Sequence, residues 1–142
     1  IRETPNLDWL LLTKRAPNIK KYLPDDWGDG YENVWLGVTV EDIEHGYPRI
    51  DHLRNVPSTI KFLSIEPLLE PLNGLDVSGI DWVIVGGESG SNAREMKLSW
   101  VLDIFDVCSN KLIPFFFKQH GGRGKDKGGC LINGNEFKEF PG

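Results

Sequence analysis

The amino-acid sequence predicts an α/β fold: a partial (β/α) barrel of about five parallel strands with outer helices, followed by a small C-terminal β-hairpin. Two observations support this prediction. Five short and nearly continuous apolar segments recur along the chain, which is typical of strands covered on both faces of a parallel sheet. Each segment ends abruptly in polar residues, and the ends recur at about the length of one barrel βα unit, roughly 30 residues.

The five expected strands are rich in Trp, Leu, Val, Ile and Phe, residue types that favour sheets. They lie at residues 9–13, 34–40, 60–65, 82–85 and 114–117. The chain starts at Ile1 and soon enters the first strand, so it looks like a piece cut from a longer protein. We therefore expect the missing N-terminal portion of the same protein as a partner. With about three strands of a full barrel absent, the sheet is expected to be open. Its exposed edges and inner face favour either self-association into a homo-oligomer or covering by the tail of the chain.

Three segments between the strands are predicted to form crossover helices. The first, at residues 17–23, is short. The second, at residues 42–56, has apolar residues at helical spacing. The third, at residues 100–112, carries an apolar stripe and follows Ser99, a good N-cap. The link at residues 67–81 contains two prolines and two glycines and is predicted to be mostly loop.

The composition of the chain changes after residue 120. Residues 1–120 are expected to be the C-terminal part of a (β/α) barrel, and residues 121–142 an appendage. The appendage starts with a glycine-rich basic loop, which is interpreted as mobile. It continues into a hairpin around the Asn133-Gly134 turn, because this dipeptide favours two-residue hairpin turns.

Length, charge and cysteine content exclude several classes of protein. A chain of 142 residues suits one domain, and its net charge of −5 excludes a uniformly basic nucleic-acid binder. Two cysteines exclude a disulfide-rich scaffold and a four-cysteine metal site built from this chain alone. The longest apolar run is too short to span a bilayer, so we expect no membrane partner and a cytoplasmic location.

Polar side chains gather at the carboxyl ends of the expected strands, where ligands bind in parallel α/β folds. The candidate ligand-binding residues are Lys14, Arg15, Thr39, Glu41, Ser64, Glu66, Gly86, Gly87, Glu88, Lys118, Gln119 and His120. The three glutamates could accept hydrogen bonds from a ligand, act as acid and base, or hold a hard cation. Alternatively, they form structural ion pairs with the neighbouring lysines and arginine. One shared cavity is expected for Lys14, Glu41, Glu66, Glu88 and Lys118.

The most specific local motif is Gly86-Gly87-Glu88, whose glycine backbone is expected on the rim of this cavity. Glycines directly after a buried strand allow backbone N–H groups to approach a ligand, although a tight turn requires the same residues. The segment lacks the lysine of a P-loop and the glycine spacing of a dinucleotide-binding fingerprint.

The three histidines are weaker signals. His120 follows a strand and is therefore the better candidate for chemistry, whereas His45 and His52 are interpreted as solvated rather than as metal ligands. The sequence assigns no catalytic residue and no metal site.

The strand-end motifs, taken in order, are similar to those of one known family. They are Leu12-Thr13-Lys14-Arg15, Trp35-Leu36-Gly37-Val38-Thr39-Val40-Glu41, Ser64-Ile65-Glu66-Pro67-Leu68-Leu69, Trp82-Val83-Ile84-Val85-Gly86-Gly87-Glu88-Ser89-Gly90 and Pro114-Phe115-Phe116-Phe117-Lys118-Gln119. Over nearly its whole length, the chain resembles the C-terminal portion of an uncharacterised phage-associated family. Full-length proteins of that family have an N-terminal three-cysteine segment and are often regarded as radical-SAM-like. The chain departs at His120, where relatives often have tryptophan.

This resemblance implies that the missing N-terminal portion carries the cysteines of a [4Fe–4S] cluster and binds S-adenosylmethionine. It implies no cofactor in the present chain. Gly86-Gly87-Glu88 is similar to the Gly-Gly-Glu segment that holds the methionine amine in radical-SAM enzymes, but here it follows a late strand instead of an early one.

Two main functional hypotheses follow. In the first, the chain is the substrate-side half of a radical-SAM-like barrel enzyme, inactive alone. Its glutamates orient polar groups of the cofactor or substrate, while Lys14, Arg15 and Lys118 bind an anionic substrate, of which a nucleotide-like molecule is one example. In the second, a non-redox module binds an anionic or phosphorylated ligand, or a divalent cation, at the same strand ends. A protein-interaction domain that uses the basic loop and hairpin is a weaker third reading.

Overall fold

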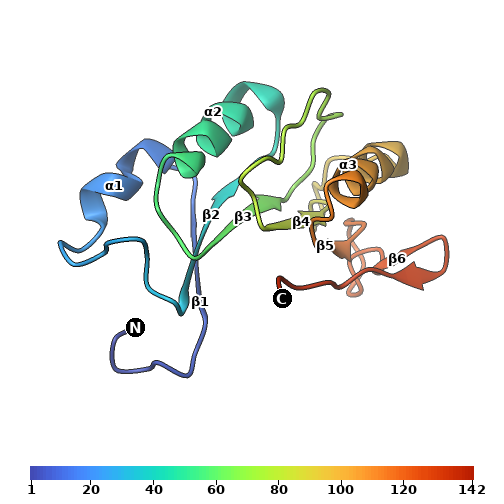
Figure 1. The fold of residues 1–142 in the computed structure, drawn as a ribbon. Helices are drawn as coiled ribbons and strands as arrows, with labels where there is room; N and C mark the ends of the chain where they lie inside the picture. Colours follow the sequence, from blue (N-terminus) through green and yellow to red (C-terminus); the bar gives the residue numbers. More distant parts are fainter.

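The computed structural model describes residues 1–142 and contains one five-stranded parallel sheet (Figure 1). The strands are β1 (Trp9–Thr13), β2 (Val34–Thr39), β3 (Ile60–Ile65), β4 (Trp82–Gly86) and β5 (Phe115–Gln119). All neighbours are parallel, and their order in the sheet, β1-β2-β3-β4-β5, is their order in the chain. The prediction of five parallel strands is therefore confirmed.

The helices all lie on one side of this sheet (Figure 1). They are a short 3-10 turn at Ala16–Asn18 that continues into α1 (Ile19–Tyr22), then α2 (Ile43–Arg54) and α3 (Leu98–Asn110). Right-handed crossovers between successive neighbours place every connection on the same face, which explains this arrangement. None of the helices is both long enough and apolar enough to cross a membrane.

The main core lies between the sheet and its helices. Alternate strand residues such as Val38, Leu63 and Phe117 are fully buried there. Residues 67–81 form the predicted loop, and its apolar side chains, including Leu68 and Val77, fill the place that a helix would otherwise occupy.

Helix α3 begins earlier than expected. Its N-cap is Lys97, whose backbone is extended, so the prediction of Ser99 as the N-cap is wrong. Lys97 makes no side-chain hydrogen bond to the helix, but its ammonium lies 5.7 Å from the centre of the Trp100 ring. The start of α3 is thus set without the side-chain cap that the sequence pattern favours.

The opposite face of the sheet has no helix over it. Trp82 is the centre of an aromatic cluster on this face, with ring centroids 5.9 Å from Trp35, 5.8 Å from Phe62 and 6.0 Å from Phe116. Phe140 of the C-terminal tail packs on the same ring, at 5.3 Å. The tail therefore covers part of a face that otherwise remains open.

The two edges of the sheet differ. The tail runs antiparallel along the outer edge of β5, where the Phe117 amide donates to Phe137 and the Glu139 amide donates to Phe115. Strand β1 pairs only with β2. Leu10 and Leu12 also lie on the face without helices and are 45% and 49% exposed. The expectation that the first strand is buried is therefore wrong, because β1 lacks both an outer neighbour and a cover on that face.

The predicted hairpin is present as β6 (Leu131–Ile132) and β7 (Asn135–Glu136). Asn133 and Gly134 both have positive φ, as a type I′ turn requires. The glycine-rich loop before it, residues 120–129, folds back on itself through backbone hydrogen bonds, among them His120 to Gly129.

Candidate functional site

The carboxyl ends of the strands carry two adjoining polar hollows instead of the single cavity that we expected. The first, of about 410 Å³, includes Lys14 and Glu41 in its lining, and the second, of about 360 Å³, includes Glu66 and Lys118. Glu88 lines both hollows. The five residues expected to share one cavity therefore surround one edge of the sheet, which we call the mouth.

Glu41 follows the end of β2 and is only 8% exposed. Its carboxylate accepts from the Lys14 ammonium at 2.6 Å and from the Arg49 guanidinium at 2.8 Å. Arg49 comes from α2 and also donates to the carbonyl and hydroxyl oxygens of Thr39. Burial raises the pKa of Glu41, but the donors and charges of Lys14 and Arg49 outweigh it, so the pKa lies below its ordinary value.

Glu66 follows the end of β3 and links to β5. Its carboxylate lies 3.1 Å from the Lys118 ammonium and accepts from the Gln119 amide at 2.9 Å. Gln119 is 4% exposed and also donates to the Gly87 carbonyl. At Gly86 a Cβ would lie 3.3 Å from the Glu66 carboxyl carbon, so glycine allows these two strand ends to approach closely.

Glu88, after β4, is bound by a residue that the sequence did not indicate. Both of its carboxylate oxygens accept from the Arg94 guanidinium, at 2.9 and 2.8 Å, and one also accepts from the Arg94 amide. Hydrogen bonds from the Arg94 side chain and then its amide lower the pKa of Glu88 to about 2. The cations that pair with the glutamates therefore include Arg49 and Arg94 in addition to Lys14 and Lys118.

Gly87 is required by a backbone contact. A Cβ on this residue would lie 1.9 Å from the carbonyl oxygen of His120, closer than any side chain allows. Its amide donates to the Gln119 carbonyl, and the Gly122 amide donates to the Glu88 carbonyl. The loop after β4 and the glycine-rich loop thus pack directly on each other at the mouth.

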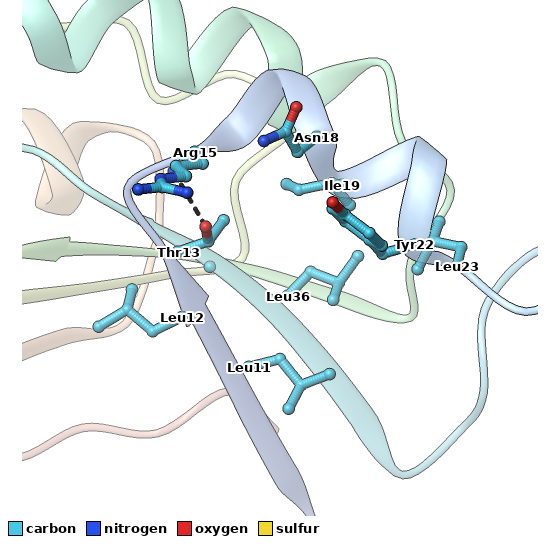
Figure 2. A pocket seen from close by; sticks show the side chains of 10 residues that line it. Leu11, Leu12, Thr13, Arg15, Asn18, Ile19, Tyr22, Leu23 and Leu36 are labelled. Carbon is cyan, nitrogen blue, oxygen red and sulfur yellow. Dashed lines mark hydrogen bonds between the residues drawn. The ribbon is translucent and has the colours of Figure 1, made fainter.

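Four sequence candidates do not line the hollows of the mouth: Gly86 and Gln119, which are buried, and Arg15 and His120. Arg15 lines a separate, mainly apolar pocket of about 300 Å³ between β1 and α1, beside Leu11 and Ile19 (Figure 2). His120 directs its Nε2 to the Leu131 carbonyl at 2.7 Å and packs on the Phe117 ring. Its position holds the loop against the hairpin. Thr39 and Ser64 do lie in the second hollow.

Sequence reasoning missed the four other ionisable residues of the first hollow: Asp42, His45, Arg49 and Arg94. Three of them lie on one face at the start of α2, at positions 42, 45 and 49. This helical spacing directly after a strand end was a usable signal. Arg94 lies in a loop, and nothing in the sequence indicates its partner.

The mouth offers hydrogen-bond donors more than acceptors. Each of the three glutamates already binds a cation, whereas the side chains of Lys14, Lys118 and Arg94 are 63%, 49% and 62% exposed. No group of three or more His, Cys, Asp or Glu residues lies together in a way that would hold a metal ion.

Comparison with known proteins gives one match, which is to a family model. Comparisons with curated proteins and with solved structures found no match. One family model covers residues 1–141, almost the whole chain. The protein therefore belongs to the family described as "Protein of unknown function (DUF5131)".

Proposed function

We propose that this chain is the substrate-side part of a larger, cytoplasmic (β/α)-barrel enzyme of the radical-SAM type, inactive on its own and phage-associated. One observation carries the proposal: five parallel strands stand in chain order, with all helices on one face. A doubly wound sheet reverses its strand order and has helices on both faces. A barrel keeps the chain order and has helices only outside. The uncovered face is therefore best explained as a barrel interior.

The interior face supports this assignment because it is continuous with the mouth. An open hollow of about 330 Å³ runs along it and is lined mainly by apolar residues, including Leu10, Trp82 and Phe116. Ser64, Glu66 and Lys118 line both this hollow and the second hollow of the mouth. A ligand with an apolar part and an anionic part would find both environments side by side.

The chemistry of the mouth favours an anionic substrate, of which a nucleotide-like molecule is one example. Lys14 and Lys118 each have ammonium hydrogens that their glutamate partners do not occupy. Arg94 uses its Nε and one terminal nitrogen on Glu88, which leaves the other terminal nitrogen free. Phosphate and carboxylate groups accept such donors in strong, charge-assisted hydrogen bonds.

The residues of this chain do not fit a [4Fe–4S] cluster. Such clusters are held by cysteine thiolates, and the chain has only Cys108 and Cys130. Cys108 lies in the core, where burial and then the Glu139 charge raise the pKa of its thiol to about 12. The cluster of the proposed enzyme would belong to cysteines outside this chain.

The Gly86-Gly87-Glu88 segment also does not fit the methionine amine of S-adenosylmethionine. The Gly86 carbonyl accepts from the Leu68 amide, and the Gly87 carbonyl accepts from Gln119. Glu88 is held on both oxygens by Arg94. The segment is better explained by its packing against the glycine-rich loop, so we assign the cofactor no contact in this chain.

The proposal is tested on the full-length protein purified without oxygen. We expect bound iron and sulfide, together with cleavage of S-adenosylmethionine to 5′-deoxyadenosine under reducing conditions. Replacing cysteines outside this chain should remove the iron, whereas Cys130→Ser, as the matched control, should retain it. A reconstituted full-length protein without iron would refute the radical-SAM assignment.

A non-redox module that binds an anion at the same mouth is the second candidate. All three glutamates are already paired with a cation, which favours binding of an anion at the mouth over binding of a divalent cation. Calorimetric titration with inorganic phosphate should then show binding that Lys14→Ala or Lys118→Ala weakens and Lys20→Ala, on α1, does not. Titration with Mg²⁺ should show none, and the reverse result would contradict the anionic assignment.

We also propose that the N-terminal portion supplies a strand and helix against β1, instead of a second copy of this chain. The apolar pocket between β1 and α1, whose lining includes Leu11 and Leu12, 41% and 49% exposed, would be covered by such a unit (Figure 2). Light scattering of the full-length protein should show a monomer. A dimer, or fast hydrogen exchange of the β1 amides, would contradict this arrangement.

A further inference from the structure

The start of α2 holds an imidazole against a carboxylate at the mouth. Asp42 is the N-cap of α2, and one of its carboxylate oxygens accepts from the His45 amide at 2.8 Å. The two oxygens also lie 3.0 and 3.1 Å from Nδ1 of the His45 ring. Capping accounts for the contact to the amide but not for the contact to the ring.

This contact determines how the ring can act. A carboxylate beside Nδ1 favours the tautomer with the proton on that nitrogen, and leaves the lone pair on Nε2. Nε2 of His45 has no hydrogen-bond partner in the protein, and the side chain is 59% exposed. By contrast, Nε2 of His120 is occupied by the Leu131 carbonyl.

The pair faces the first hollow of the mouth, where it is surrounded by charged groups. Asp42 and His45 both line this hollow of about 410 Å³. The other charged groups that line this hollow are Lys14, Glu41, Arg49, Glu88 and Arg94. The Glu70 carboxylate accepts from the Ile43 amide at the start of the same helix. A ligand whose anionic group binds Lys14 or Arg94 would therefore lie beside a ring nitrogen that can accept a proton.

We propose that His45 is the proton-transfer residue of this site and that Asp42 is its positioning residue. The inference rests on the proposed binding of an anionic ligand at the mouth. Nε2 takes a proton from an O–H or N–H group of that ligand: the ligand bond breaks, an N–H bond forms, and the electron pair stays on the ligand. The Asp42 carboxylate stabilises the imidazolium, which returns the proton to the product, so no electrons are gained or lost.

The first test measures the tautomer by NMR of the full-length protein labelled with ¹⁵N-histidine. We expect His45 to have its proton on Nδ1 at about pH 8, where imidazole is neutral. Asp42→Asn should shift the proton to Nε2 while the unfolding midpoint stays the same, because asparagine is an equally good N-cap. His52, on the same helix, should not change. A proton on Nε2 of His45 in the unaltered protein would overturn the proposal.

The second test measures the Nε2 lone pair directly. Diethylpyrocarbonate acylates neutral imidazole, and mass spectrometry gives the rate at His45 relative to His52. We expect this ratio to fall several-fold in Asp42→Asn at about pH 8. An unchanged ratio would show that Asp42 does not position the ring and would overturn the proposal.

A third experiment distinguishes a failure of this inference from a failure of the proposed function. If an anion binds at the mouth, added inorganic phosphate should slow the acylation of His45 but not that of His52. An absence of protection, with the tautomer and the rate ratio as expected, would count against the anionic ligand and leave the His45–Asp42 pair in place. Protection with an unchanged ratio in Asp42→Asn would refute the pair alone.

Discussion

Replacing Glu41 by glutamine tests whether the mouth contributes to the stability of the fold. The substitution keeps the size of the side chain and removes its charge, while Lys14 and Arg49 remain. The Glu41 and Arg49 side chains are only 11% and 17% exposed, whereas Lys14 is 63% exposed. Arg49 therefore loses its main partner in a place that water reaches poorly, although it keeps its two hydrogen bonds to Thr39.

The expected loss in unfolding free energy is about 2 kcal/mol. Breaking a fully buried ion pair costs about 3–5 kcal/mol, and a hydrogen bond to a charged group is worth about 1.5–3 kcal/mol. The expected loss lies below the range for a fully buried ion pair because Lys14 remains hydrated and the amide oxygen of the introduced glutamine would still accept one hydrogen bond. For a protein of this size the melting temperature should fall by about 8 °C.

The pH dependence of stability gives a second check on the same residue. The pKa of Glu41 lies below its ordinary value of 4.5 in the folded state, so the native protein binds this proton less readily than the unfolded chain does. The stabilisation is therefore fully present above pH 4.5 and is lost as the pH falls through the lower native pKa. Glutamine does not titrate, so the difference between the two proteins should shrink in this range.

Urea unfolding at neutral pH and at about pH 3 measures both effects. Glu95→Gln is the control, because Glu95 is exposed and forms no ion pair, and it should change neither value. If Glu41→Gln unfolds at the same urea concentration as the unaltered protein at neutral pH, the ion pairs of Glu41 do not stabilise the fold. The argument from burial would then be refuted.

Three further predictions concern the loops and the core. Gly87→Ala should destabilise the protein by at least about 1–3 kcal/mol in urea unfolding, because its Cβ would overlap the His120 carbonyl; an unchanged midpoint would contradict the packing of the two loops. Leu112→Gly should stabilise by about 0.5–1 kcal/mol, because this leucine is 92% exposed and has a φ of 56° at the end of α3; any loss of stability would count against that reason. Cys130 should react with a thiol reagent at about pH 8 while Cys108 reacts only after unfolding, because burial raises the pKa of Cys108 to about 12; equal native rates would refute its burial.

The sequence by itself determined the elements whose causes are local. A strand buried in a parallel sheet needs apolar residues on both faces, so Val34–Thr39 and Ile60–Ile65 were predicted almost to the residue. The hairpin followed from the Asn133-Gly134 turn, since both positions need a positive φ. The gathering of polar residues at the carboxyl ends followed from the parallel arrangement, which brings the polar residue after each strand to one edge.

Only the tertiary structure decided which groups meet at that edge. Arg49 binds Glu41 because one face of α2 turns toward the end of β2, and Arg94 binds Glu88 because a loop folds back over it. His120 follows a strand as a catalytic residue would, but its ring turns to the Leu131 carbonyl instead. Hydrogen bonds and ion pairs require distances near 3 Å between residues far apart in the chain, and these distances depend on helix phase and loop path.

The exposure of β1 also depends on the tertiary structure. The run Trp9–Thr13 has the composition of an interior strand, and that composition correctly predicts a strand. Whether its leucines are covered depends on a neighbour, because burial is a property of what packs on a strand. The sequence therefore determines that β1 is a strand, whereas the elements around it determine how much of its surface is exposed to water.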